Sequence, residues 1–351
     1  MSWEENVRKV IPYTPGEQPK EQNIIKLNTN ENPYEPAPGV RKMLAETDFA
    51  DRLRKYPDPA ATNLVKAISK AYNMPEDQIF VGVGSDDVLA MSYLAFFNSE
   101  KPVLFPDITY SFYDVWAEEF RVPYKTIPLD ENFELDIDGF LQENGGVIIP
   151  NPNAPTGVLE TIENMEKIVK NNPDSVVIID EAYVDFGGVS ALPLVEKYEN
   201  LLVVQTFSKS RSMAGSRIGF AFGSKKLIKY LMDVKYSFNS YTMDQITIEL
   251  GAAALADKAY FEETCSKIVE TREWSKEQFI KLGFKFADSK SNFVFVTHET
   301  KAAKDIFEAL KKQGIFVRYF NRPRIDNYLR ITIGTRQEME ALFAFLKEYL
   351  G

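Results

Sequence analysis

The segment TFSKSRSMAGSRIG, residues 206–219, contains the residue types needed to bind an aldehyde and a phosphate. Lys209 lies between two serines, eight residues before Arg217 and 29 residues after the aspartate of VVIIDEAY, Asp180. A lysine that forms an imine must spend time uncharged, which requires burial or neighbouring cations. Arg217 can supply such a cation while its guanidinium pairs with a phosphate. This spacing predicts a lysine joined to an aldehyde cofactor.

Two strand-like segments would position these groups. Residues 176–179 form an apolar, mostly β-branched run that ends at Asp180, and residues 201–205 (LLVVQ) repeat the pattern just before the lysine segment. Continuous apolar runs are typical of buried parallel strands, whose C-terminal ends are where ligands bind in open α/β sheets. We therefore expect four side chains in one crevice: Asp180, Tyr183, Ser208 and Lys209.

Simpler explanations exist for each residue alone. A single loop lysine is usually a solvated surface charge, and Asp180 could only cap a helix. The joint arrangement of a strand-end aspartate, a tyrosine three residues later, a second strand and then SK and GSRIG favours the cofactor site over these alternatives.

Composition limits the class of protein. The chain has 351 residues, 44% of them hydrophobic, and a net charge of −10, which argues against nonspecific nucleic-acid binding because no basic tract is present. The charged N-terminus and the lack of about 20 consecutive apolar residues predict no membrane anchor. The single cysteine, Cys265, excludes an intrachain disulfide and predicts a cytoplasmic location. The single histidine, His298, argues against a Ser-His-Asp triad or a histidine-rich metal site.

The order of apolar segments predicts an α/β fold. We expect an N-terminal arm over residues 1–35, a large domain with a mostly parallel central sheet over 36–235, and a smaller C-terminal α+β domain over 236–351. In the large domain, strands and helices alternate from residue 64 to about 205. After about residue 235, helices are followed by the strand segments FKFADSKSNFVFV, IFVRYF and YLRITIG and a terminal helix.

Other residues are candidates for ligand contacts. Gly84 and Ser85 follow the strand QIFVGVG and open a helix, whose free N–H groups favour a phosphate, although Ser85 could simply cap the helix. Tyr110 could stack on a planar cofactor or be an ordinary buried aromatic. Asn153 lies in the loop NPNAPTG, where asparagine often only holds a turn. Arg330 lies within YLRITIG and needs a partner, which could be an external carboxylate.

Several of these motifs together resemble those of the pyridoxal-phosphate-dependent aminotransferases of fold type I. They are NPNAPTG, IIDEAYVDF, TFSKSRSMAGSRIG, YLRITIGT, LNTNENPY and KYPDP. They are most similar to the histidinol-phosphate aminotransferases, and the resemblance covers nearly the whole chain. It implies the cofactor pyridoxal 5′-phosphate and amino-group transfer between histidinol phosphate or imidazole-acetol phosphate and 2-oxoglutarate or glutamate, in histidine biosynthesis.

The resemblance also implies roles for individual residues. Lys209 would hold the cofactor as an imine and move a proton from the substrate Cα to the cofactor C4′. Asp180 would keep the pyridine nitrogen protonated, Tyr183 would donate to the ring hydroxylate, and Tyr110 would stack on the ring. The residues around the cofactor phosphate would be Gly84, Ser85, Asp86, Thr206, Ser208 and Arg217.

The resemblance further implies a homodimer with shared active sites, in which Tyr56 of KYPDP reaches the phosphate of a neighbouring subunit. Arg330 would bind the carboxylate of glutamate or 2-oxoglutarate. Arg318 and Tyr13 would bind the phosphate end of histidinol phosphate, and Asn30 would also contact the substrate.

One position departs from the pattern. Relatives usually carry an asparagine immediately before PTG, where this chain has Ala154, so the amide contact to the cofactor is either missing or supplied by Asn153. The sequence also leaves open an aromatic amino-acid aminotransferase and a pyridoxal-phosphate lyase or decarboxylase, because these enzymes use the same apparatus.

Overall fold

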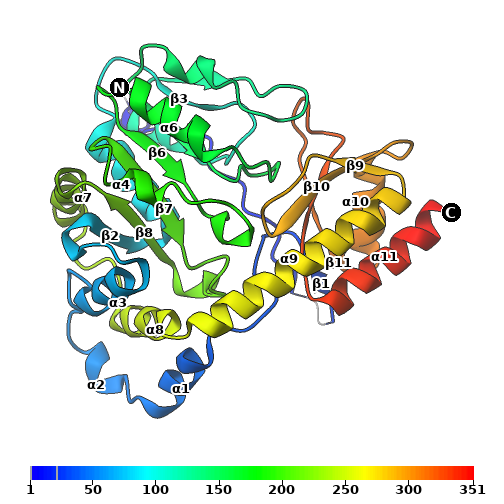
Figure 1. The fold of residues 1–351 in the computed structure, drawn as a ribbon, viewed down its shortest axis with the longest axis horizontal. Coiled ribbons are helices and arrows are strands. Elements are labelled where there is room, and N and C mark those ends of the chain that lie inside the picture. Colours follow the sequence, from blue (N-terminus) through cyan, green and yellow to red (C-terminus); the bar gives the residue numbers. More distant parts are fainter. Residues whose placement is uncertain (1, 21–22) are drawn as a thin grey trace.

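The helices and strands form two lobes joined by the long helix α9 (Lys258–Lys281), as Figure 1 shows. This computed structural model describes residues 2–20 and 23–351. Residues 1, 21 and 22 of the expected N-terminal arm lie outside the described residues. Across the described residues, no helix combines the length and apolar character needed to cross a membrane.

A seven-stranded sheet forms the centre of the larger lobe. In pairing order its strands are β2 (Ile79–Val83), β8 (Ile218–Gly223), β7 (Leu201–Thr206), β6 (Val177–Asp180), β5 (Gly146–Pro150), β3 (Val103–Pro106) and β4 (Tyr124–Ile127). Only β8 runs against its neighbours, β2 and β7. The expected α/β fold with a mostly parallel sheet is therefore confirmed. Strand β8 was not predicted from the sequence, because its segment IGFAFG mixes glycine and alanine with aromatic residues.

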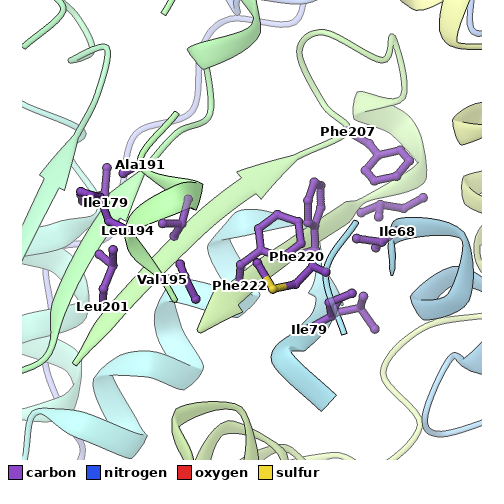
Figure 2. Packing of buried hydrophobic residues seen from close by; sticks show 14 of the residues in the cluster. Ile68, Ile79, Ile179, Ala191, Leu194, Val195, Leu201, Phe207, Phe220 and Phe222 are labelled. Carbon is purple, nitrogen blue, oxygen red and sulfur yellow. The ribbon is translucent and has the colours of Figure 1, made fainter. Parts of the chain in front are cut away.

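Helices cover both faces of this sheet because the strand residues alternate between two cores. Ile149, Ile179 and Val203 pack on one face, and the residues beside them in sequence pack on the other. Phe220 and Phe222 share the first core with Ile68 (Figure 2). The helices of this lobe are α1 (Pro38–Glu46), α2 (Ala50–Leu53), α3 (Thr62–Tyr72), α4 (Gly84–Phe96), α5 (Tyr113–Phe120), α6 (Ile162–Asn171), α7 (Lys225–Phe238) and α8 (Gln245–Leu255). Of these, α2 buries no residue and lies away from the sheet (Figure 1).

The smaller lobe contains a four-stranded antiparallel sheet. Its strands, in pairing order, are β12 (Arg318–Tyr319), β13 (Leu329–Thr332), β10 (Phe293–His298) and β9 (Phe284–Phe286), and its helices are α10 (Ala303–Lys312) and α11 (Arg336–Leu350). The segment IFVRYF, expected to be one strand, is divided. Its first part, β11 (Ile315–Phe316), instead pairs in parallel with β1 (Ile25–Lys26) from the N-terminal segment.

Helix α8 follows the expected domain boundary at residue 235, yet its buried residues belong to the core of the larger lobe. Ile248, Leu250 and Ala254 pack with the residues beneath the seven-stranded sheet. The boundaries at residues 35 and 235 stay predictions.

Helix α9 carries a buried cation that joins the two lobes. The Arg272 side chain is 2% exposed, and its Nη1 atom donates to the carbonyl oxygens of Phe186 at 2.7 Å and Ser291 at 2.9 Å. Its Nε atom donates to Glu273 at 2.8 Å. Phe186 follows β6 and Ser291 precedes β10, so one guanidinium satisfies backbone groups from both lobes.

We expect Arg272→Met to lower the free energy of unfolding by roughly 2–4 kcal/mol, because two buried carbonyl groups would lose a charged donor. Urea unfolding followed by circular dichroism measures this change. The matched control is Arg54→Met, at a side chain that is 67% exposed, which should stay within about 0.5 kcal/mol of the wild type. Equal stability of both variants would show that the guanidinium does not hold the lobes together.

Candidate active site

The parallel pairing of β6 with β7 brings the lysine segment next to Asp180. Asp180 is in register with Val204, so the chain leaves both strands at the same edge of the sheet. A cavity of about 160 Å³ lies there. The predicted site residues that line it are Ser85, Asp86, Tyr110, Asp180, Tyr183, Thr206, Ser208, Lys209 and Arg217.

Asp180 is buried, and two donors hold its carboxylate. The hydroxyl of Tyr113 donates to Oδ2 at 2.8 Å and the backbone N–H of Ala182 donates to Oδ1 at 3.2 Å. Burial raises the pKa of Asp180 to about 6, although these donors act in the opposite direction. Tyr113 was not predicted from the sequence. The only signal was its place in PDITYSFYDVW, three residues after Tyr110 and at the first residue of α5.

The N-terminal segment holds the lysine loop in place. The Nζ atom of Lys209 donates to the carbonyl oxygen of Thr29 at 3.2 Å and lies 5.7 Å from the centre of the Tyr183 ring. The Asn32 amide donates to the carbonyl oxygens of Lys209 and Ser210 at 3.1 and 3.2 Å. These contacts join parts of the chain about 180 residues apart, which is why Thr29 and Asn32 were not identified from sequence.

The guanidinium of Arg217 also lines the cavity. Arg217 Nη1 is 3.3 Å from the Ser208 hydroxyl, and Nη2 is 3.1 Å from Asp86 Oδ2. The hydroxyl of Tyr110 donates to Asp86 Oδ1 at 2.8 Å. A guanidinium beside a serine hydroxyl presents several donors to an anion with the geometry of a phosphate.

Helix α4 begins beside the Arg217 guanidinium. Its first residue is Gly84 and its cap is Val83, so the alternative that Ser85 caps the helix is wrong. Ser85 instead lies in the first turn, where unpaired N–H groups and the helix dipole favour an anion.

Backbone contacts set the position of this helix start. A Cβ atom at Gly219 would lie 2.1 Å from the carbonyl carbon of Gly84 and 2.2 Å from the nitrogen of Ser85. Gly84 itself has φ of +84°, and a Cβ there would meet Arg217. The second glycine of the GSRIG motif is therefore needed so that β8 can pass against the start of α4.

Two arginines lie side by side on neighbouring strands of the smaller sheet. Arg318 and Arg330 are register partners on β12 and β13, which places their side chains on the same face. The Arg330 guanidinium is buried, which lowers its pKa, and donates to the carbonyl oxygen of Asn28 at 3.0 Å. Among the described residues, its Nε atom has no hydrogen-bond partner and no carboxylate pairs with it. A buried, uncompensated guanidinium favours an external anion.

A larger cleft of about 1020 Å³ lies beside Arg318 and is bordered by the N-terminal arm. Arg318 donates to the carbonyl oxygens of Thr14 at 3.2 Å and Pro15 at 3.4 Å. Tyr13 stacks on Phe112, with ring centres 4.2 Å apart. Two predicted substrate residues, Tyr13 and Arg318, therefore border one cleft.

Three predicted cofactor residues do not line the cavity: Gly84, Asn153 and Tyr56. The Asn153 amide donates to the carbonyl oxygen of Ile108 at 2.9 Å and to Thr156, so it is committed elsewhere, and Ala154 lines the cavity instead. Tyr56 is 82% exposed and stacks on Tyr241 with ring centres 4.6 Å apart. Their roles in cofactor binding stay predictions.

The donors and acceptors of the cavity suit a phosphorylated pyridine aldehyde. Arg217, Ser208 and the start of α4 can take the phosphate, Lys209 can take the aldehyde carbon, and Asp180 can take a protonated ring nitrogen. These groups all line one cavity. The chemistry of the residues therefore fits pyridoxal phosphate.

Known proteins with similar sequences agree with this geometry. Residues 22–346 match the family described as Aminotransferase class I and II. The chain belongs to the class I and II aminotransferases. This aminotransferase is 52% identical over 351 residues to histidinol-phosphate aminotransferase of Lactococcus lactis subsp. cremoris strain SK11, covering 100% of this chain and 98% of the relative. It is also 52% identical to histidinol-phosphate aminotransferase of Acinetobacter baylyi, covering 99% and 97% of the two chains.

The aminotransferase fold is also found among solved structures. Histidinol-phosphate aminotransferase from Sinorhizobium meliloti, in complex with pyridoxal-5′-phosphate, aligns with a TM-score of 0.84 at 25% identity. The alignment covers 93% of this chain and 90% of that structure. This likeness confirms the expected fold type.

A second buried carboxyl group follows Asp180 in this aminotransferase. Glu181 accepts from the Ala191 N–H at 2.6 Å, the Ser190 hydroxyl at 2.6 Å and the Gln205 amide at 2.8 Å. Burial nevertheless raises its pKa to about 7, from an ordinary value of 4.5. Between these two pH values the folded protein holds more protons than the unfolded chain, so the contribution of Glu181 to stability falls as the pH rises.

We expect Glu181→Gln to remove this pH dependence. Relative to the wild type, the variant should gain about 3 kcal/mol of unfolding free energy as the pH rises from 4.5 to 7, because the amide has no proton to lose. Urea unfolding across this range measures the difference. The exposed Glu163→Gln serves as the control and should follow the wild-type profile. Parallel profiles for Glu181→Gln and the wild type would contradict the prediction.

Proposed function

We propose that this chain is a histidinol-phosphate aminotransferase that exchanges an amino group between glutamate and imidazole-acetol phosphate, giving 2-oxoglutarate and histidinol phosphate. The reaction belongs to histidine biosynthesis. The observation that carries the proposal is the cross-strand pair Arg318 and Arg330, which offers two guanidinium groups to anionic substrates. The 52% identity to enzymes of this name over the full chain supports it.

Pyridoxal phosphate is the cofactor, and when bound it supplies an electron-accepting ring that stabilises negative charge at the substrate Cα. Lys209 would bind the aldehyde and then move the proton at the substrate Cα. Asp180 would keep the pyridine nitrogen protonated, and Tyr113 and Ala182 would orient its carboxylate.

The remaining cavity residues would orient the cofactor. Ser85, Ser208 and Arg217 would bind the phosphate, with Thr206 behind them, where its hydroxyl lies 3.0 Å from that of Ser208. Asp86, which pairs with Arg217, would contribute its backbone N–H, and Tyr110 would lie along the ring.

The substrates differ at one end, because glutamate carries a carboxylate there and histidinol phosphate a phosphate. Arg330 would bind the carboxylate, and Arg318 with Tyr13 would bind the substrate phosphate at the arm cleft. A guanidinium fork can pair with either group, so two neighbouring arginines allow both substrates to use one site. Asn30 would help to complete this side of the site.

We also propose a homodimer with shared active sites, in a cytoplasmic location. Several large apolar side chains are exposed near Tyr56, where a second copy would cover them. They are Leu53, Phe238 and Tyr241. Tyr56 would then reach the cofactor phosphate of the neighbouring subunit. The single cysteine, Cys265, supports the cytoplasmic location.

Lys209→Ala should retain the fold but lose steady-state transfer between glutamate and 2-oxoglutarate, because Lys209 is the only amine among the described residues that line the cavity. A coupled glutamate assay measures turnover, and circular dichroism checks folding. The exposed Lys226→Ala is the control and should retain wild-type rates. Robust turnover by Lys209→Ala would exclude the proposed role of this lysine.

Arg318→Ala should lower kcat/KM for histidinol phosphate by roughly 10- to 100-fold while changing that for phenylalanine by less than about threefold, because a charge-assisted hydrogen bond to phosphate is lost. The matched variant is Arg322→Ala, an exposed residue of the same cleft. An equal loss for both substrates would mean that Arg318 mainly holds the arm through Thr14 and Pro15. An equal effect of Arg322→Ala would indicate that the general charge of the loop is responsible.

A further inference from the structure

The amide of Asn30 makes a direct contact with the hydroxyl of Tyr183. The Asn30 Nδ2 atom donates to Tyr183 Oη at 2.9 Å, and Asn30 is 1% exposed. The backbone of Asn30 has φ of +57°, a left-handed conformation that asparagine tolerates better than most residues. Residue type and backbone shape thus both suit this position.

The smaller lobe fixes the direction in which this amide points. Asn30 Oδ1 accepts from the Thr332 hydroxyl at 3.1 Å, while the Thr332 oxygen accepts from the Asn30 backbone N–H at 3.0 Å. The Asn292 amide donates to the Asn30 carbonyl oxygen at 2.9 Å. Among the described residues, Asn30 Oδ1 is the only acceptor for the Thr332 hydroxyl hydrogen, so a flipped amide would leave that hydrogen without a partner. The network therefore assigns the NH2 group to Tyr183.

This contact decides what the Tyr183 hydroxyl can do. Because its oxygen accepts a hydrogen bond from Asn30, its own hydrogen is free to be donated into the cavity. Donation into a hydroxyl oxygen also polarises the O–H bond and makes it a stronger donor. The Tyr183 ring itself is held edge-on by Phe293, with ring centres 5.0 Å apart.

The amide of Asn153, next to Ala154, does not orient the Tyr183 hydroxyl. Ala154 presents only a methyl group to the cavity beside Tyr183, and the Asn153 amide is turned towards Ile108. The amide that reaches Tyr183 comes from Asn30, more than 120 residues earlier in the chain.

We propose that Asn30 is a positioning residue that makes Tyr183 a hydrogen-bond donor to the cofactor ring oxygen. This inference rests on the proposed function. It also links the two lobes, because Thr332 and Arg330 lie two residues apart on β13 and so share one face. The strand that offers Arg330 to the substrate therefore also orients the amide that controls Tyr183.

The test uses the full-length protein loaded with pyridoxal phosphate and follows its visible absorption as a function of pH. Loss of a proton leaves more negative charge on the chromophore, and a donor to the ring oxygen stabilises that form. Asn30→Ala should therefore raise the pH midpoint of the spectral transition by about 0.3 to 1 unit. The other charged or titratable groups that line this cavity or lie near Tyr183 all remain in this variant. Among the described residues they are Lys209, Asp180, Arg330, Tyr110, Glu31, Asp86 and Arg217.

A double-mutant cycle shows whether Asn30 acts through Tyr183. In a Tyr183→Phe background, Asn30→Ala should shift the midpoint by less than about 0.2 unit, because there is no hydroxyl left to orient. An equal shift in both backgrounds, or no shift in the wild-type background, would overturn the proposal.

A second pair of variants covers the case in which Asn30→Ala fails to fold. Thr332→Val removes the hydroxyl that orients the amide and should raise the midpoint, whereas Thr332→Ser keeps the hydroxyl and should not. Equal midpoints for the two variants would also overturn the proposal. Coupling between Asn30 and Tyr183 without turnover of histidinol phosphate would show that the proposed substrate is wrong while the positioning role holds.

Discussion

The register between β6 and β7 is the constraint on which the active site depends. Asp180 lies opposite Val204, and five residues beyond Val204 the chain has turned into the cavity at Lys209. A shift of one residue in β6 would turn the Asp180 side chain to the other face of the sheet and into an apolar core, and a shift in β7 would displace Lys209 from Asp180. The apolar packing on both faces of the sheet therefore holds Asp180 and Lys209 at the same edge.

Two charged groups of the site, Asp180 and Arg330, are buried at a cost that a ligand would offset. Asp180 is desolvated, and Arg330 is buried next to Arg318. Such arrangements are unfavourable in isolation, since like charges on paired strand positions repel and buried charges lose hydration. The packed cores around the two sheets supply the stability that allows these charges to be buried. The electrostatic strain lies where anionic substrates and a cationic ring nitrogen would relieve it.

Sequence was a good guide to local features and a poor guide to contacts between distant segments. The apolar runs at residues 176–179 and 201–205 predicted β6 and β7, and the motifs predicted nine residues that line the cavity. Strand β8 was not predicted because its glycines and alanine weaken the apolar pattern. Asn32 and Thr29 could not be identified because their partners lie about 180 residues away, and nothing in LNTNENPY shows which asparagine meets which backbone group.

The contact between Gly219 and the start of α4 has a consequence for how this enzyme can diverge. Main-chain atoms of Gly219, Gly84 and Ser85 fix the dimensions of the proposed phosphate site. Exchanging side chains there therefore cannot enlarge this site without moving strand β8. The cleft beside Arg318 is bordered by an exposed arm and loop, whose side chains can be replaced with little effect on either core. New substrates can therefore be acquired at one end of the site while the cofactor end stays unchanged.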